Sequence, residues 1–202
     1  WKEGQTKLLI DSIARNYPIG SLLILGRNEQ VPLKSRRLNA EYPIKHENEQ
    51  SQREVFDEPS SESYYVLDGQ QRLTSVARVF LDAHPSRNYY FDLKKMYQLF
   101  SEESTSWIIS RARGKSNPDR KDDKRLIRTD VALDQQKCDF YISEYMEDSG
   151  DFPEFAADRA LARRASAKLK GIFETIRNFS IPCVALENDA PLESVCRVFE
   201  TI

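Results

Sequence analysis

One short segment constrains this chain more than any other, because it predicts a strand, a glycine turn and a helix in direct succession. Tyr64 to Leu67 is an apolar run of strand length, and Asp68-Gly69 interrupts it. Apolar side chains then recur at the spacing of one helix face, at Leu73, Val76, Ala77 and Phe80. The segment therefore predicts a strand, tight turn and helix unit.

The predicted turn carries residue types that suit a phosphate group. A glycine lets the backbone approach a ligand closely, and the first turn of a helix offers unpaired N–H groups at the positive end of its dipole. Arg72 adds a forked cation, and Asp68 is suited to holding a divalent metal or orienting a water. The amides of Gln70 and Gln71 are suited to sugar, phosphate or the attacking water. The alternative is that Asp68 only caps the helix, Gly69 only makes the turn and Arg72 is solvated.

The rest of the chain shows further alternation of helical and strand patterns. Periodicity and turn residues predict helices at 7–15, 133–147, 154–179 and 192–202, and strands at 20–26, 89–93 and 181–186. Residues 28 to 63 are polar and unpatterned, which predicts a long loop or insertion. Residues 107 to 128 are basic and interrupted by glycine and proline, so a loop is expected there as well. Because residue 1 is Trp and the last helical pattern has no cap, we expect the chain to be part of a longer protein.

Composition excludes several classes of protein. The chain has 202 residues, of which 40% are hydrophobic, and its net charge is -2, so it has a core but no overall field that favours nucleic acid. Three cysteines without a C-x-x-C pair exclude a disulfide framework and a cysteine zinc site, and two histidines are too few for most histidine-dependent hydrolases. No apolar run reaches the length of about 18 residues that a membrane span needs. We expect a cytoplasmic protein without a membrane partner.

A local basic cluster is the second candidate site. Eight cations stand close together in the sequence, namely Arg111, Arg113, Lys115, Arg120, Lys121, Lys124, Arg125 and Arg128. Such an excess suits DNA phosphates, with Arg120, Lys121, Lys124 and Arg125 as the predicted contacts. A solvated loop is the alternative. Gly114-Lys115-Ser116 resembles the end of a P-loop but lacks the glycine that should precede it.

A metal-dependent nuclease is a less favoured alternative. Asp92 and Lys94 on the predicted strand could form a D-x-K pair, in which the carboxylate binds metal and the lysine activates water. The second carboxylate would have to come from Asp68 or Asp82. The competing interpretation is a strand with ordinary alternating polar residues.

The sequence from Val66 to Thr74, V-L-D-G-Q-Q-R-L-T, resembles the D-G-Q-Q-R-L-T signature of the N-terminal domain of GmrSD-type and SspE-type restriction proteins. These proteins form a branch of the ParB/sulfiredoxin-like superfamily. The resemblance extends upstream to Trp1, the helix near Leu9 and the strand after Ile19, and downstream to the final V-F-x-x-I pattern. It covers nearly the whole chain, though thinly between residues 100 and 180.

The resemblance implies a mixed α/β fold, a ParB/sulfiredoxin-like domain with a helical insertion or subdomain. It places a nucleotide-binding core at residues 1–100, with 28–63 as a polar insertion. A basic loop and helical subdomain follow at 101–180, and residues 181–202 return a strand and a helix to the core.

The resemblance also implies an NTPase, often with GTP preferred and with Mg²⁺, that senses modified or foreign double-stranded DNA. It would control an HNH-type nuclease domain or subunit outside this chain in anti-phage restriction, and a homo-oligomer is a further expectation. The implied roles fall on the turn segment, with Asp68, Gln71 and Arg72 catalytic, Gly69, Gln70, Arg72 and Thr74 binding nucleotide, and Asp68 holding the metal. A non-hydrolysing, DNA-binding switch remains the alternative. The family's Q-R-x-Y/F and Asn-Thr-x-Gly stretches would lie before Trp1 and after Ile202.

Overall fold

The computed structural model describes residues 2–26, 64–84, 86–102, 104–113, 123–148 and 151–186. These residues form six α-helices and two three-stranded sheets, so the mixed α/β class is confirmed for this part of the chain. Contacts divide the chain into two compact units. The smaller unit comprises residues 20–73 and 181–202, and the larger unit comprises residues 1–19 and 74–180. The predicted loop at 28–63 and the predicted helix at 192–202 lie outside the described residues.

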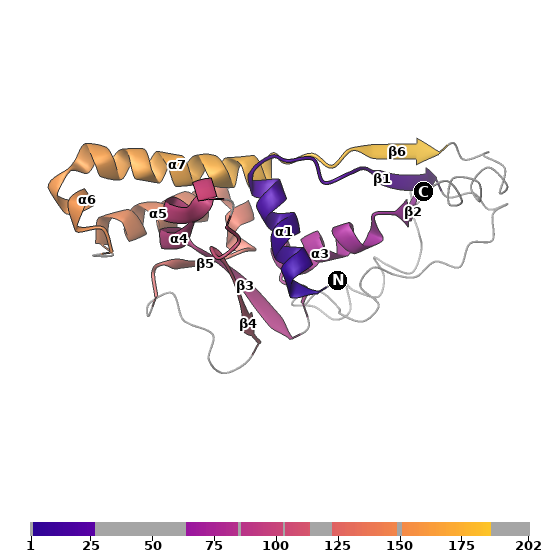
Figure 1. Ribbon diagram of the computed structural model, residues 1–202, viewed down its shortest axis with the longest axis horizontal. Helices are drawn as coiled ribbons and strands as arrows, with labels where there is room; N and C mark the ends of the chain where they lie inside the picture. Colours follow the sequence, from indigo (N-terminus) through magenta and orange to yellow (C-terminus); the bar gives the residue numbers. More distant parts are fainter. Residues whose placement is uncertain are drawn as a thin grey trace. The chain divides into compact units, whose positions relative to one another are not determined.

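The sheet of the smaller unit has β1 (Leu22–Gly26) at its centre (Figure 1). β1 pairs antiparallel with β2 (Tyr64–Asp68) and parallel with β6 (Cys183–Leu186). Four of the five β1 residues are buried, as the continuous apolar run predicted for a covered central strand. The register with β2 pairs Leu23 with Asp68 and is irregular between Leu23 and Ile24. This irregularity therefore lies beside the residue where β2 ends.

The predicted strand, turn and helix unit is confirmed. β2 ends at Asp68, Gly69 makes the turn, and α3 (Gln70–Phe80) begins at once. The N–H of Leu73 donates to the carbonyl of Gly69 at 3.0 Å, so the turn residue already belongs to the hydrogen-bond ladder of the helix. The glycine thus joins strand and helix without an intervening loop.

The sheet of the larger unit has β3 (Arg87–Asp92) between β4 (Ile108–Ala112) and β5 (Leu126–Arg128), with both pairs antiparallel. The prediction of a loop throughout 107–128 was therefore wrong for these two segments. β4 and β5 are the edges of their sheet, and most of β4 is only partly buried. Edge strands carry charged residues on their open side, so their apolar alternation is short and weak in the sequence.

Helices cover the rest of the larger unit. They are α1 (Glu3–Ala14), α4 (Leu93–Leu99), α5 (Gln135–Asp148), α6 (Pro153–Ala157) and α7 (Arg159–Arg177), with short 3-10 turns at Phe100–Glu102 and Val131–Leu133. The single helix predicted for 154–179 was wrong, because Asp158 leaves the helical region and separates α6 from α7. Its carboxylate accepts the N–H groups of Ala160 and Leu161 at 2.8 and 3.1 Å, which caps α7.

The larger unit has one aromatic-rich core. Phe91 of β3 lies 5.4 Å from Trp107 and 5.5 Å from Phe173 of α7, between ring centroids. The buried face of α7 consists of Ala165, Leu169, Ile172, Phe173 and Ile176. No helix among the described residues is long and apolar enough to cross a membrane.

Candidate functional site

Arg72 is held between two glycines of the smaller unit. Gly20 and Gly69 both adopt positive φ angles, of 82° and 86°, which L side chains rarely adopt. A Cβ atom added to Gly20 would overlap Nη1 of Arg72. A Cβ atom added to Gly69 would overlap the side chain of Leu22 and would lie 3.1 Å from Nη2 of Arg72. Both positions therefore require glycine, for backbone conformation and for space.

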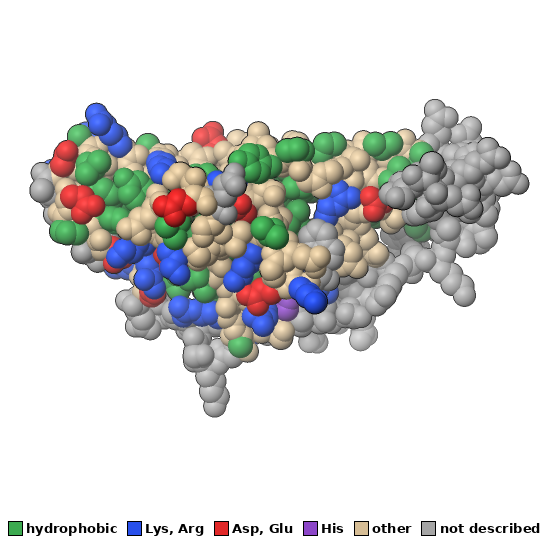
Figure 2. Space-filling model, viewed as in Figure 1, with side chains coloured by type: hydrophobic (Ala, Val, Ile, Leu, Met, Phe, Trp, Pro, Cys, Tyr) green, Lys and Arg blue, Asp and Glu red, His purple; other side chains and the backbone are tan. Residues whose placement is uncertain are grey.

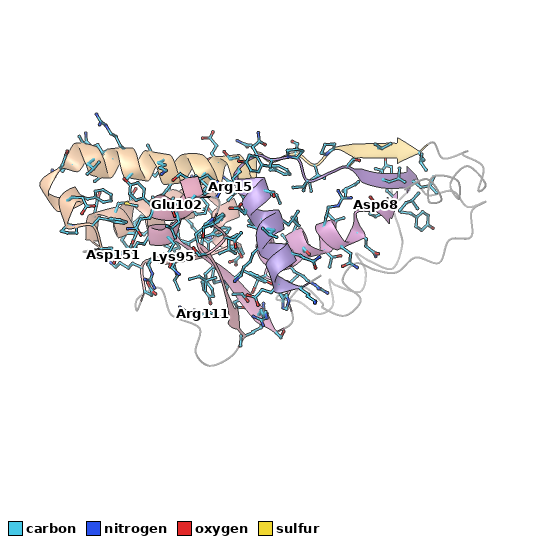
Figure 3. The ribbon with its side chains drawn as sticks, viewed as in Figure 1. Arg15, Asp68, Lys95, Glu102, Arg111 and Asp151 are labelled. Carbon is cyan, nitrogen blue, oxygen red and sulfur yellow. The ribbon has the colours of Figure 1, made fainter. Side chains whose placement is uncertain are left out.

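Arg72 also forms an ion pair with Asp68. Its Nη2 donates to Oδ2 of Asp68 at 3.0 Å, across one turn of chain at the start of α3. Figure 3 shows Asp68 where β2 meets α3. The side chain of Arg72 is 17% exposed and that of Asp68 is 51% exposed. The interpretation of Arg72 as a solvated side chain was therefore wrong, whereas Asp68 presents a carboxylate to solvent.

The two glutamines of the D-G-Q-Q-R sequence are exposed in the first turn of α3. Thr74 is partly buried one turn later and belongs to the larger unit, so the candidate site described here ends at Leu73. The site thus joins an oriented guanidinium, a solvent-facing carboxylate, two exposed amides and the start of a helix. Such an arrangement can bind an anion and, through the carboxylate, a hydrated cation.

Gly20 is the site residue that sequence reasoning missed. The sequence marked it only as the boundary of a strand. A glycine immediately before a buried strand was the available signal, but its contact with Arg72 comes from a distant part of the sequence.

The basic cluster is largely neutralised where the structure describes it. Lys124 pairs with Glu144 at 3.1 Å, and Arg125 lies 3.4 Å from Asp123 and 3.5 Å from Asp92. Arg120 and Lys121 lie outside the described residues. Two of the four predicted DNA contacts therefore already have carboxylate partners.

The flanking arginines of the basic cluster are paired too. Asp82 binds both Arg113 and Arg128, and Arg128 also makes a two-pronged contact with Asp130 at 2.7 and 2.9 Å. The guanidinium of Arg111 lies over the ring of Tyr90 at 5.9 Å. Because most of these cations have carboxylate partners in the fold, the net positive charge of the basic cluster is smaller than its sequence indicates.

The exposed side of α7 carries a second group of cations. Arg159, Arg163 and Arg164 are exposed, and they line or flank a groove of about 760 Å³ formed with α5 and α6. Lys168 donates to the carbonyl of Tyr97 at 3.1 Å and lies 5.1 Å from its ring centroid. These three arginines of α7 are therefore more open to an external anion than Lys168 of the same helix.

The D-x-K alternative does not have the predicted geometry. Asp92 ends β3 and is 1% exposed, and its Oδ1 accepts the N–H of Lys95 to cap α4. Lys94 lies on α4 rather than on a strand, and its Nζ pairs with Asp151 at 3.0 Å. The described residues contain no group of three His, Cys, Asp or Glu side chains that could hold a metal ion. Asp92 thus serves the fold as a helix cap.

The comparison with protein families covers the whole chain. The family described as GmrSD restriction endonuclease, N-terminal domain, matches residues 1–202. No curated protein matches the sequence. The match includes β2, the glycine turn and the start of α3, where the candidate site lies. The chain therefore belongs to the family of GmrSD restriction endonuclease N-terminal domains.

Proposed function

We propose that this chain is the nucleotide-binding and hydrolysing sensor domain of a restriction protein. It binds a nucleoside triphosphate, with GTP preferred, at the start of α3. The observation that carries the proposal is the placement of Arg72, whose guanidinium is held over Gly20 and Gly69 and beside Asp68. Fixing an arginine in this way lowers the conformational cost of binding a phosphate, because its rotamer is already set.

Each residue of the turn segment has a role in this proposal. Arg72 contacts the phosphates, and Gly69 lets them approach the backbone at the start of α3. Both glutamine amides are exposed and can therefore reach a bound ligand. In this proposal Gln70 contacts the nucleotide and Gln71 orients the attacking water. Thr74, also predicted as a nucleotide contact, belongs to the larger unit and is not part of the site proposed here.

Asp68 fits the role of a Mg²⁺ ligand. Its carboxylate is 51% exposed, and Mg²⁺ in nucleotide sites is commonly bound by one or two carboxylates together with phosphates and water. The ion would neutralise phosphate charge. Asp68 would hold it beside Arg72, so that one carboxylate orients both a cation of the protein and the metal.

Family membership supports a role in restriction, and we propose that the domain senses modified or foreign double-stranded DNA. Arg163 and Arg164 of α7 are exposed and are the proposed contacts to DNA phosphates, with Arg120 and Lys121 as further contacts. The nuclease that the domain controls is an HNH-type domain or subunit outside this chain. We also propose that the chain has a ParB/sulfiredoxin-like fold, with a core formed by residues 1–100 and 181–202 and a helical subdomain at 101–180. We further propose that the protein assembles as a homo-oligomer.

Calorimetry with GTP and Mg²⁺ tests the nucleotide site. Arg72→Ala should weaken binding about tenfold or more, because a charge-assisted hydrogen bond contributes about 1.5 to 3 kcal/mol. Arg164→Ala, which removes an exposed arginine from α7, is the control and should leave the affinity unchanged. Equal affinity of the Arg72→Ala variant and the parent chain would reject the proposed site.

The ion pair of Asp68 favours one alternative function, a nucleotide switch without turnover. A carboxylate that is already paired with an arginine has to share or give up that ion pair before it can bind a metal ion. Hydrolysis assays on the full-length protein separate the two functions. Turnover that disappears in Asp68→Asn while binding remains supports the enzyme. Binding without turnover in the parent protein supports the switch.

A further inference from the structure

A second polar cavity lies entirely within the larger unit and is lined by residues outside the D-G-Q-Q-R sequence. Its volume is about 210 Å³. Its hydrogen-bond donors come from α1, α3, β3 and the turn that follows α3, and they are Thr6, Ser75, Arg78, His84, Arg87 and Tyr89. Figure 2 shows histidine surface among basic and acidic surface on this face of the molecule. Of the described residues that line the cavity, all but Tyr89 have polar or charged side chains.

The hydroxyl groups of this cavity are deeply placed. Thr6, Ser75 and Tyr89 are 7%, 5% and 5% exposed. Burying polar side chains has a free-energy cost that hydrogen bonds must offset. Tyr89 also packs in the apolar core, whereas the hydroxyls of Thr6 and Ser75 lie at the cavity, which indicates a place for a polar occupant.

The charge around the cavity is positive. Arg78 and Arg87 line it, and Glu3 is its one carboxylate. Glu3 is already held by Arg87 at 2.8 Å and by Lys7 at 2.9 Å. The hydrogen bond from Lys7 is the main cause that lowers the pKa of Glu3, so this carboxylate is ionised at neutral pH. Among the described residues that line the cavity, two arginines therefore face one carboxylate, and the surplus positive charge favours a negatively charged occupant.

His84 lines the cavity beside the same charged side chains. Its Nδ1 accepts the N–H of Ser86 at 3.3 Å, which assigns the proton of the neutral ring to Nε2. Burial lowers the pKa of His84, and so do the charges of Arg78, Arg87 and Arg113, whereas Glu3 acts in the opposite direction. The cationic side chains around the ring thus outnumber the anionic one, as expected for a place that attracts anions.

We propose that this cavity binds a tetrahedral oxyanion, namely a phosphate group, between Arg78, Arg87 and His84. The guanidinium groups supply charge-assisted hydrogen bonds, and the buried hydroxyls of Thr6 and Ser75 supply neutral ones. A volume of about 210 Å³ is below the roughly 300 to 1,000 Å³ of typical ligand pockets, so it suits a phosphate group rather than a nucleoside. The site shares no residue with the nucleotide site proposed at Asp68 to Arg72, so an experiment that rejects one proposal does not reject the other.

Nuclear magnetic resonance of His84 tests the proposal directly. The chain has two histidines, so His46→Gln leaves one imidazole signal. Titration with inorganic phosphate, against chloride at equal ionic strength, should raise the pKa of His84, because a bound dianion favours the imidazolium. An unchanged pKa and an unchanged chemical shift would overturn the proposal and leave a cavity that holds water.

Two arginine variants locate the anion. Arg78→Gln and Arg87→Gln should each weaken the apparent phosphate affinity about tenfold or more, whereas Arg164→Gln on α7 should not. Phosphate affinity that is the same in all three variants would also overturn the proposal. Circular dichroism checks that each variant is folded, and the His84 titration of the parent chain does not depend on any arginine variant.

A parallel titration distinguishes the source of the phosphate group. Inorganic phosphate and a nucleoside monophosphate offer the same oxyanion, but only the second carries a large substituent. If both raise the pKa of His84, the cavity accepts the phosphate end of a larger molecule. If only inorganic phosphate does, the cavity binds the free anion.

Discussion

Arg72 donates from Nη2 to Oδ2 of Asp68 at 3.0 Å, while the same guanidinium lies against the backbone of Gly20 and Gly69. One side chain therefore connects the entry to β1, the end of β2 and the first turn of α3. A surface ion pair of this kind contributes little to stability on its own. Its value is positional, because the ion pair and the space left by the two glycines place the guanidinium at the start of the helix.

The two glycines should be intolerant of a methyl group. We expect Gly69→Ala to destabilise the chain by about 1 to 2 kcal/mol for its left-handed backbone, and further through its overlap with Leu22. Gly20→Ala should displace Arg72 and weaken nucleotide binding together with stability. Urea unfolding and calorimetry measure the two effects.

Gly171→Ala is the matched control for these glycine variants. Gly171 lies exposed within α7, and an added Cβ would meet nothing within 4 Å. This variant should stabilise the chain by about 0.5 to 1 kcal/mol, since alanine is the better helix former. Nucleotide binding that survives Gly20→Ala unchanged would show that Gly20 does not position Arg72.

Asp11 should be one of the most sensitive polar residues of the larger unit. It is 8% exposed, accepts from Nε1 of Trp107 at 3.3 Å and pairs with Nε of Arg15 at 2.8 Å. Asp11→Ala leaves both donors without this acceptor, so we expect a loss of about 3 kcal/mol in urea unfolding. Lys137→Ala, which removes an ion pair between exposed side chains, should change stability little. A small effect of Asp11→Ala would mean that other acceptors replace the carboxylate.

Cys138 should make stability depend on pH in the alkaline range. Its side chain is fully buried, and burial raises the pKa of its thiol to about 11. The thiol ionises more readily in the unfolded chain, so its contribution is present below about pH 9 and declines as the pH rises from about 9 to 11. The difference in unfolding free energy between the parent chain and Cys138→Ala should fall by about 2 kcal/mol across that range. A difference that stays constant from pH 9 to 11 would contradict the raised pKa of the Cys138 thiol.

Labelling of the cysteines checks the same burial independently. Cys183 is exposed on β6 and should react with iodoacetamide at pH 8, whereas Cys138 should react only after unfolding. Peptide mapping by mass spectrometry assigns each modified residue. Equal rates for Cys138 and Cys183 would contradict the buried position.

The sequence predicted those elements whose pattern is local. β2, Gly69 and α3 follow one another with strong periodicity and a glycine between them, so their order was predictable from residues 64 to 80. β4 was missed because it buries few side chains, and β5 because it has only three residues. Asp158 was missed as a cap because it lies inside a helical pattern. Two features could not be predicted because they bring together residues that are far apart in the sequence, and no local pattern indicates such contacts. They are the contact of Gly20 with Arg72 and the cavity around His84.

The salt dependence of DNA binding should separate paired from exposed cations. The observed affinity falls with salt by a slope of roughly 0.9 for each phosphate that a cation neutralises. Lys124 and Arg125 already contact Glu144, Asp123 and Asp92, so replacing both with alanine should leave this slope nearly unchanged. Replacing the exposed Arg163 and Arg164 with alanine should reduce it by about 1.8.

The same variants should not alter discrimination between DNA substrates, because phosphate contacts carry no direct sequence information. The Arg163 and Arg164 variant should therefore lose affinity about equally for modified and unmodified duplexes, measured by fluorescence anisotropy at two salt concentrations. An Arg120→Ala and Lys121→Ala variant tests the remaining predicted contacts in the same assay. If substitution of Lys124 and Arg125 lowers the slope as much as substitution of the α7 arginines, their ion pairs open on DNA and the basic cluster is the contact surface. If no variant changes the slope, neither group of cations touches the DNA backbone.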